Sequence, residues 1–244
     1  MFRSIIFSIL LVPLSLSAIV VTGGPTVYWL KRHRQGGAVQ DGVMLGGRLA
    51  VERDIANGWF WGLDGAVAYG RLHGETGDDQ RLKSRFLETK FEGNFGYAIS
   101  DLFVSRWRLT PFAGYTYYHN NNRFISPSPL QVRFEDDVHM AHLGLTIDRL
   151  CFDPFEFGLR FRFKWMLEGE SHVKDDPVHS EVTLKMDEKY QFALELPIAI
   201  PACHLVIVPF YTYRHFGGRE NFPFDFLDTK YHSVGAHIHI RRFF

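Results

Sequence analysis

An acidic segment near the middle of the chain holds residue types that could activate water. Asp136, Asp137 and His139 are close in sequence, and Asp78 and Asp79 form an earlier acidic pair. Carboxylates and an imidazole around one water could deprotonate it for hydrolysis. Acidic side chains on exposed loops are usually only solvated, and no serine and histidine stand at a spacing that specifies a nucleophile. The sequence therefore assigns no catalytic residue.

Four residues in the last third of the chain suggest a metal site. Glu195, His204, His237 and His239 share one side if the last strands alternate as their polar residues indicate. Two imidazoles and a carboxylate on adjacent strands could hold zinc, which accepts nitrogen and oxygen ligands. A hydrogen bond between His204 and Glu195 is the simpler expectation. We assign no metal ligand and expect no cofactor.

The elements that position these side chains are strands, because apolar and polar residues alternate along most of the chain. In residues 155–168 one side is apolar from Phe155 to Leu167, and the other carries Arg160, Arg162 and Lys164. The expected strands are residues 25–32, 43–54, 59–69, 87–99, 106–119, 131–149, 155–168, 182–196, 203–216 and 229–244. The first is included because an all-antiparallel barrel needs an even number. A shift of apolar parity near Met140 predicts either a β-bulge there or a strand that leaves the membrane at this point.

The first 18 residues have the features of a signal peptide. Arg3 precedes an apolar run from Ile5 to Val12, and small residues follow at Ser15 and Ser17. The run is shorter than the ~20 residues that span a membrane as a helix. We therefore expect residues 1–18 to be removed and residues 19–244 to form one domain.

Composition narrows the class of this domain. The 27 basic and 27 acidic residues balance, which argues against a nucleic-acid partner, and phenylalanine occurs 23 times. No later apolar run is long enough for a transmembrane helix, so a chain that enters a membrane must do so as a closed barrel. The expected fold is all-β: an antiparallel up-and-down transmembrane β-barrel of about ten strands. A secreted lipocalin-like or avidin-like barrel, apolar inside, is the alternative.

Connection lengths predict an orientation. The connections at residues 33–42, 72–82, 120–129 and 217–228, and the one after Glu168, are long, and those between them are short. Outer-membrane barrels have short periplasmic turns and longer external loops, so both termini are expected in the periplasm. Cys151 and Cys203 then lie at the periplasmic rim on different hairpins, and we expect no disulfide bond between them.

The last strand resembles that of the small Gram-negative outer-membrane β-barrel proteins. The chain ends in Phe244, and the apolar residues at alternate positions before it are Val234, Ala236, Ile238 and Ile240. Arg242 departs from this pattern. The resemblance implies an outer-membrane location, recognition by the barrel-assembly machinery, and contact with outer-membrane lipid and lipopolysaccharide. It does not identify a subfamily.

A ten-stranded barrel has a narrow interior, and its charged residues suggest what it does. Arg160, Arg162 and Lys164 are expected to face Glu88 and Glu92, as a plug or along a slit for ions. A broad porin is excluded, since open channels need more strands. We expect a narrow or plugged barrel with a structural or surface-interaction role, its loops open to an extracellular ligand.

Two other functions stay open. One is a small ion-conducting pore. The other is a hydrolase acting on peptides or lipids, because ten-stranded barrels include the omptin proteases, in which acidic residues and a histidine activate water between external loops. Asp136, Asp137 and His139 match that chemistry in residue type only.

Overall fold

The structure is a computed structural model in which almost every described residue belongs to one β-sheet. It describes residues 19–34, 36–54, 58–100, 107–129, 131–152, 154–175, 181–187, 189–217 and 228–244, without the side chains of 149–152. The expected signal peptide, residues 1–18, lies outside the described residues. The strands are β1 (Ile19–Arg34), β2 (Val39–Asp54), β3 (Trp59–Glu75), β4 (Arg81–Tyr97), β5 (Ile99–Ser100), β6 (Trp107–Phe124), β7 (Arg133–Phe152), β8 (Phe155–Lys174), β9 (Val182–Lys185), β10 (Tyr190–Glu195), β11 (Ile198–Ile200), β12 (Leu205–Phe216) and β13 (Thr229–Phe243). A short 3-10 helix, η3 (Pro201–Cys203), precedes β12.

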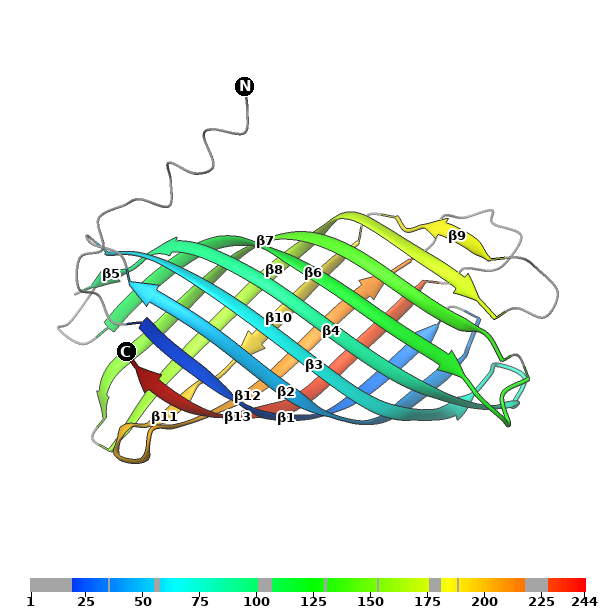
Figure 1. The fold of residues 1–244 in the computed structure, drawn as a ribbon, viewed down its shortest axis with the longest axis horizontal. Coiled ribbons are helices and arrows are strands. Elements are labelled where there is room, and N and C mark those ends of the chain that lie inside the picture. Colours follow the sequence, from blue (N-terminus) through cyan, green and yellow to red (C-terminus); the bar gives the residue numbers. More distant parts are fainter. Residues whose placement is uncertain are drawn as a thin grey trace, which may run out of the picture.

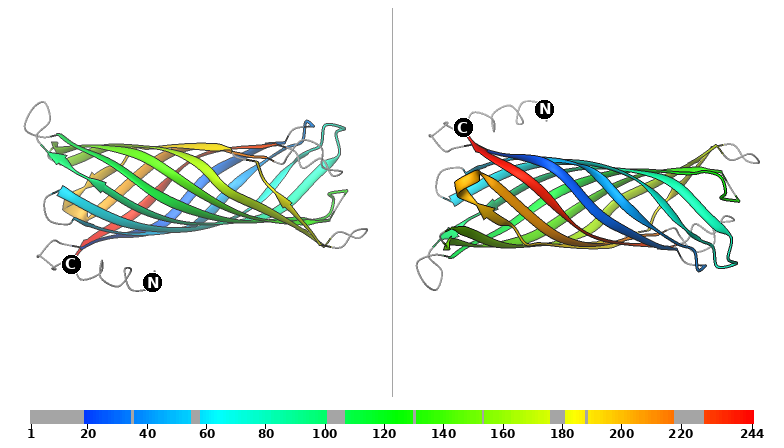
Figure 2. Two further views of the ribbon diagram at one scale, coloured as in Figure 1. Left: turned by 90° about the horizontal axis from the view of Figure 1, so that it is seen from above. Right: turned by 90° about the horizontal axis from the view of Figure 1, so that it is seen from below.

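These segments form ten antiparallel barrel strands that close on themselves. The short β5 continues β4 alongside β6, and β9, β10 and β11 together form one barrel strand against β8. The first and last strands pair along their whole length, from Val20 beside Phe243 to Arg34 beside Thr229. The strands run obliquely around the long axis (Figures 1 and 2). The expected fold class is confirmed, including β1, which the sequence supported only through the need for an even strand number.

The start of β1 and the C-terminus lie at the same end of the barrel (Figure 1). We call this the terminal end and the opposite one the loop end. Among the described residues, no helix is long and apolar enough to cross a membrane.

The strands at the loop end are longer than expected. The backbone pairing of β3 with β4 continues to Glu75 beside Arg81, and that of β6 with β7 to Arg123 beside Arg133. About half of each expected long connection at 33–42, 72–82 and 120–129 is therefore strand. The difference arises because the apolar pattern marks only the part of a strand that faces apolar surroundings, whereas the hydrogen-bonded ladder needs no apolar side chain.

The outer face is apolar, as expected. Phe157, Phe161 and Leu167 point outward from β8 and are 44%, 44% and 55% exposed, whereas Arg162 and Lys164 between them are buried. An apolar exterior around a polar interior is the arrangement of a membrane barrel and the reverse of a soluble one.

The register of β7 against β8 shifts by one residue between His139 and Met140, because Leu167 of β8 has no partner on β7. A β-bulge is therefore present at the predicted level, but its extra residue is on β8 and not on β7. The inward positions of β7 keep one parity through Asp136, Val138, Met140 and His142. The apolar pattern of β7 changes because Val138 and Met140 belong to an apolar cluster inside the barrel.

Candidate functional site: the charged lumen

Seven charged side chains form a continuous series of ion pairs across the barrel interior. In order of contact this ion-pair chain consists of Lys90, Asp64, Arg48, Glu195, Arg162, Glu92 and Lys164. They come from β2, β3, β4, β8 and β10, so the chain joins strands that are not neighbours in the sheet. Four positive and three negative groups leave one excess positive charge.

The strongest part of the ion-pair chain surrounds Arg162. Its Nη1 donates to Glu195 Oε1 at 2.6 Å, and its Nε lies 3.1 Å from Glu92 Oε1. Glu92 also accepts from the Lys164 ammonium group, and Thr116 Oγ1 donates to it at 3.2 Å. All of these charged side chains are at most 6% exposed. A buried charge is tolerated only when it is paired and hydrogen-bonded, and here each has such partners.

At the other end of the ion-pair chain Arg48 and Asp64 are equally buried, whereas Lys90 is 16% exposed. Arg48 Nε donates to Asp64 Oδ2 at 2.5 Å, and Lys90 Nζ lies 3.0 Å from Asp64 Oδ1. Arg48 Nη1 reaches Glu195 Oε1 at 3.5 Å, which connects the two halves. A separate ion pair, between Arg214 and Glu88, lines the same cavity as Lys90 and Lys164.

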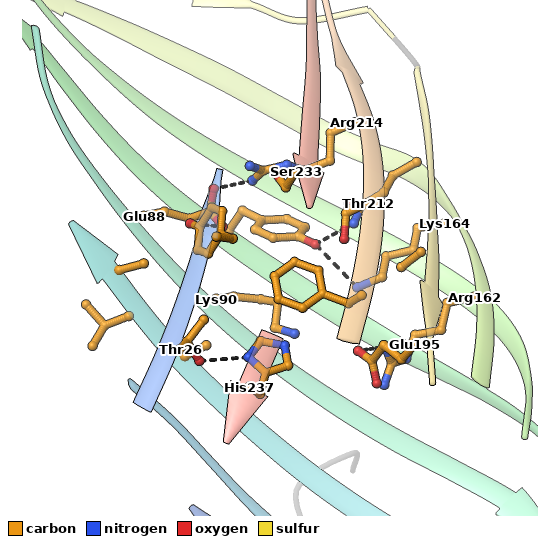
Figure 3. A pocket seen from close by; sticks show the side chains of 18 of the residues that line it. Thr26, Glu88, Lys90, Arg162, Lys164, Glu195, Thr212, Arg214, Ser233 and His237 are labelled. Atoms are coloured by element: carbon orange, nitrogen blue, oxygen red, sulfur yellow. Dashed lines mark hydrogen bonds and ion pairs between the residues drawn. The ribbon is translucent and has the colours of Figure 1, made fainter. Parts of the chain in front are cut away.

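Between these groups lies a small cavity, shown in Figure 3. Its volume is about 70 Å³, and its lining includes Glu88, Lys90, Lys164, Arg214 and His237. A single water needs roughly 10 to 15 Å³ of such space, so the cavity has room for several waters.

An apolar layer fills the interior next to this cavity, toward the loop end. It consists of Tyr28, Leu30, Met44, Ala68, Leu72, Phe86, Tyr118, Val138, Met140, Met166, Met186, Phe216 and Tyr231. These side chains come from strands all around the barrel, and Leu30, Met44, Leu72 and Phe86 have no exposed surface. The ion-pair chain and the apolar layer together fill the middle of the lumen with side chains.

The sequence identified part of this site. Arg162 and Lys164 meet Glu92 as expected, but Glu88 pairs with Arg214. Arg160 lies 3.4 Å from Glu52 and 3.8 Å from Glu195, near the terminal end. Sequence reasoning did not include Arg48, Asp64 or Arg214 in the set. Each is a charged residue on the inward side of an otherwise apolar or small-residue stretch, which is the signal that could have identified it.

The candidate hydrolytic residues do not converge. Asp136 points inward and accepts from Ser171 at 2.6 Å. Asp137 points outward and lies 2.9 Å from His119 Nδ1, and His139 contacts Tyr115 on the same outer face. Asp78 and Asp79 are exposed in the turn between β3 and β4. Successive strand residues point to opposite faces, so Asp136 and Asp137 cannot act on one water.

The expected pairing of His204 with Glu195 is wrong. His204 occupies the turn after η3, with φ of 55°, and is exposed, whereas Glu195 is part of the buried ion-pair chain. His237 and His239 do point inward, and Thr26 Oγ1 lies 2.7 Å from His237 Nδ1. Within the described part of the chain, no three His, Cys, Asp or Glu side chains are arranged to hold a metal ion.

Of the two cysteines expected not to form a disulfide bond, the structure describes the side chain of one. Cys203 is a free, exposed thiol at the terminal end. The side chain of Cys151 lies outside the described residues.

Comparison with known proteins concerns the fold. No protein-family model and no curated protein sequence matches the chain. The structure is similar to the outer membrane protease OmpT from Escherichia coli, with 12% identity and a TM-score of 0.63 over 93% of this chain and 96% of that chain. Outer membrane protein OprG from Pseudomonas aeruginosa matches with 11% identity and a TM-score of 0.44 over 93% and 96% of the two chains.

The translocator domain of autotransporter NalP from Neisseria meningitidis matches with 9% identity and a TM-score of 0.45 over 96% and 92% of the two chains. Of these three proteins, OmpT is similar enough in structure to be informative, and at 12% identity the likeness concerns the fold alone. The chain is thus a closed, antiparallel ten-stranded barrel with the fold of small outer-membrane β-barrel proteins.

Proposed function

We propose that this protein is an integral outer-membrane barrel with a plugged lumen, which serves a structural or surface-interaction role and does not conduct ions. The observation that supports the proposal is the filled lumen. The ion-pair chain and the apolar layer follow one another along the barrel axis, with the apolar layer toward the loop end. An ion passing through would have to separate buried pairs such as Arg162 and Glu195 and then cross Leu30, Met44 and Phe86 without hydration. Both steps are costly.

The membrane location rests on the exterior. Outward-facing apolar residues occur on strands around the barrel, among them Trp29, Leu45, Val67, Phe95, Leu143, Phe161, Leu194 and Ile240. Hydrocarbon covers such a surface, and a closed barrel leaves no unpaired sheet edge in it. We propose outer-membrane lipid and lipopolysaccharide as the surrounding partners and a periplasmic position for both termini. The loop end then faces the outside, where the connections could meet an extracellular ligand.

Conductance in a planar lipid bilayer tests the plug. We expect no stepwise current from the purified full chain at about 100 mV, a voltage that drives one elementary charge with roughly 2.3 kcal/mol. The variant Leu30→Ala/Phe86→Ala removes apolar volume from the layer. It is the positive control, in which we expect current more readily than in the unaltered protein. Steady current from the unaltered protein would overturn the proposal in favour of a small pore.

Cell fractionation tests the location. The protein should remain with outer membranes after a carbonate wash, and its folded form should migrate differently from the heated form in detergent gels. Recovery in the soluble periplasmic fraction would contradict membrane insertion. Hydrolysis of peptide or lipid substrates by the purified protein would favour the hydrolase, a function that the opposite directions of Asp136 and Asp137 do not support.

A further inference from the structure

Two arginines at the loop end of the lumen differ from every arginine in the ion-pair chain. Arg32 and Arg34 lie on β1, and Arg32 is 2% exposed. Arg48 and Arg162 each pair with two carboxylates, whereas within the described ranges no carboxylate oxygen lies within ion-pair distance of Arg32 or Arg34. Arg32 is thus buried and Arg34 half-buried, and neither has a direct counter-ion among the described residues.

Aromatic rings lie next to both guanidinium groups. Arg32 Cζ lies 5.7 Å from the Tyr231 ring centroid and 5.9 Å from that of Phe124, and Arg34 Cζ lies 4.8 Å from that of Phe134. Such rings attract the positive charge but accept no conventional hydrogen bond from the guanidinium N–H groups. Several of these groups are unsatisfied here, because Nε and Nη1 of Arg32 and Nε of Arg34 are buried without a hydrogen-bond partner.

Further unpartnered donors follow the inward face of β6 next to Phe124. Asn120 and Asn122 are at most 2% exposed, and both side-chain atoms of each amide lack a hydrogen-bond partner. Both arginines act electrostatically on Asp136, which accepts a hydrogen bond from Ser171. Two cations and one anion leave an excess positive charge. Water could satisfy the donors, but only an anion also offsets the charge.

We propose that Arg32 and Arg34 bind a small oxyanion, the carboxylate or phosphate group of a solute that enters from the loop end. Guanidinium edges donate two parallel hydrogen bonds to such a group, and the Asn122 amide can donate a third. The apolar layer lies between this position and the charged lumen, so the solute binds without crossing the barrel. The site thus goes beyond the proposed plugged barrel, and its failure would leave the conductance result unchanged.

Calorimetric titration of the full chain in detergent micelles tests the site. The probes are inorganic phosphate and acetate, each against chloride at equal ionic strength. We expect saturable binding of at least one probe, and Arg32→Gln should weaken it by about tenfold or more, as expected for the loss of a charged hydrogen bond. Binding of phosphate alone assigns a phosphoryl ligand, and binding of acetate alone a carboxylate ligand.

Lys31→Gln is the matched control, because Lys31 is the preceding residue on the outer face of the same strand. It should bind the probe like the unaltered protein. Asn122→Ala, which keeps the charge, should weaken binding by a smaller factor and replaces Arg32→Gln if that variant does not fold. The proposal is overturned if neither probe binds. It is also overturned if Arg32→Gln, or Asn122→Ala in its place, binds the probe as tightly as the unaltered protein, or if Lys31→Gln weakens binding as much as Arg32→Gln does.

Discussion

Glu92 on β4 and Arg162 on β8 meet across the lumen, with 3.1 Å between Glu92 Oε1 and Arg162 Nε and neither side chain more than 3% exposed. Two barrel strands, β6 and β7, separate β4 from β8 in the sheet. The contact therefore ties the barrel together through its interior as well as around its wall.

Replacement of Glu92 tests this internal tie. Glu92→Gln leaves Lys164 and part of Arg162 without a counter-charge, so we expect the free energy of unfolding to fall by about 3 to 5 kcal/mol. Urea unfolding in lipid vesicles, followed by tryptophan fluorescence, measures it. The control is Glu52→Gln, since Glu52 is 44% exposed beside Arg160; its effect should be below about 1 kcal/mol. Equal losses of unfolding free energy in the two variants would mean that the buried ion pairs of the lumen stabilise the barrel no more than an exposed pair does.

The outward row of β8 should be sensitive to charge. Phe161 lies midway along the outward apolar run from Phe155 to Leu167. Phe161→Arg should lower the free energy of unfolding by about 2 to 4 kcal/mol, and Phe163→Arg should behave alike. Phe155→Arg, at the terminal end of the run, should cost about 0 to 1 kcal/mol. Harmless substitutions at Phe161 and Phe163 in vesicles would contradict a lipid-facing position.

Thiol labelling should report the orientation. In a Cys151→Ser background, the exposed Cys203 at the terminal end should react with a membrane-impermeant maleimide only after the outer membrane is permeabilised. In a background that also carries Cys203→Ser, Asp78→Cys in the β3–β4 turn should react on intact cells. Mass spectrometry measures both reactions. The reverse result would place the termini outside.

The terminal phenylalanine should matter for assembly more than for stability. Phe244 is 77% exposed, and its backbone makes two hydrogen bonds of 2.9 Å with Ile19, which a substitution retains. Phe244→Ser should lower the amount of folded barrel in cell membranes, while the variant refolded in detergent should unfold within about 0.5 kcal/mol of the unaltered protein. Phe243→Ser is the control. Normal membrane levels of Phe244→Ser would show that the assembly machinery does not require this residue.

The sequence alone determined the two faces of the barrel wall. Side chains alternate along a strand with a period of two, so the row from Phe155 to Leu167 and Arg162 could be assigned to opposite faces without any tertiary contact. The closed barrel then showed that the apolar row is the outward one. The change of apolar parity near Met140 indicated a bulge in that strand, whereas the structure places the extra residue on the neighbouring β8 and keeps Val138 and Met140 on the inward face. The same period separates Asp136 from Asp137, so the sequence already held the reason why these two residues do not form a hydrolytic site.

Only the tertiary structure decided which lumen charges meet and where the strands end. Glu92 contacts Arg162 and Lys164 because ten tilted strands are staggered by a particular amount, and a pattern within one strand carries no information about that stagger. The strands continue to Arg34 and Glu75 because their backbones still pair after the apolar side chains stop. For the same reason Arg32 has no carboxylate at ion-pair distance among the described residues: the stagger places the rings of Phe124 and Tyr231 beside it.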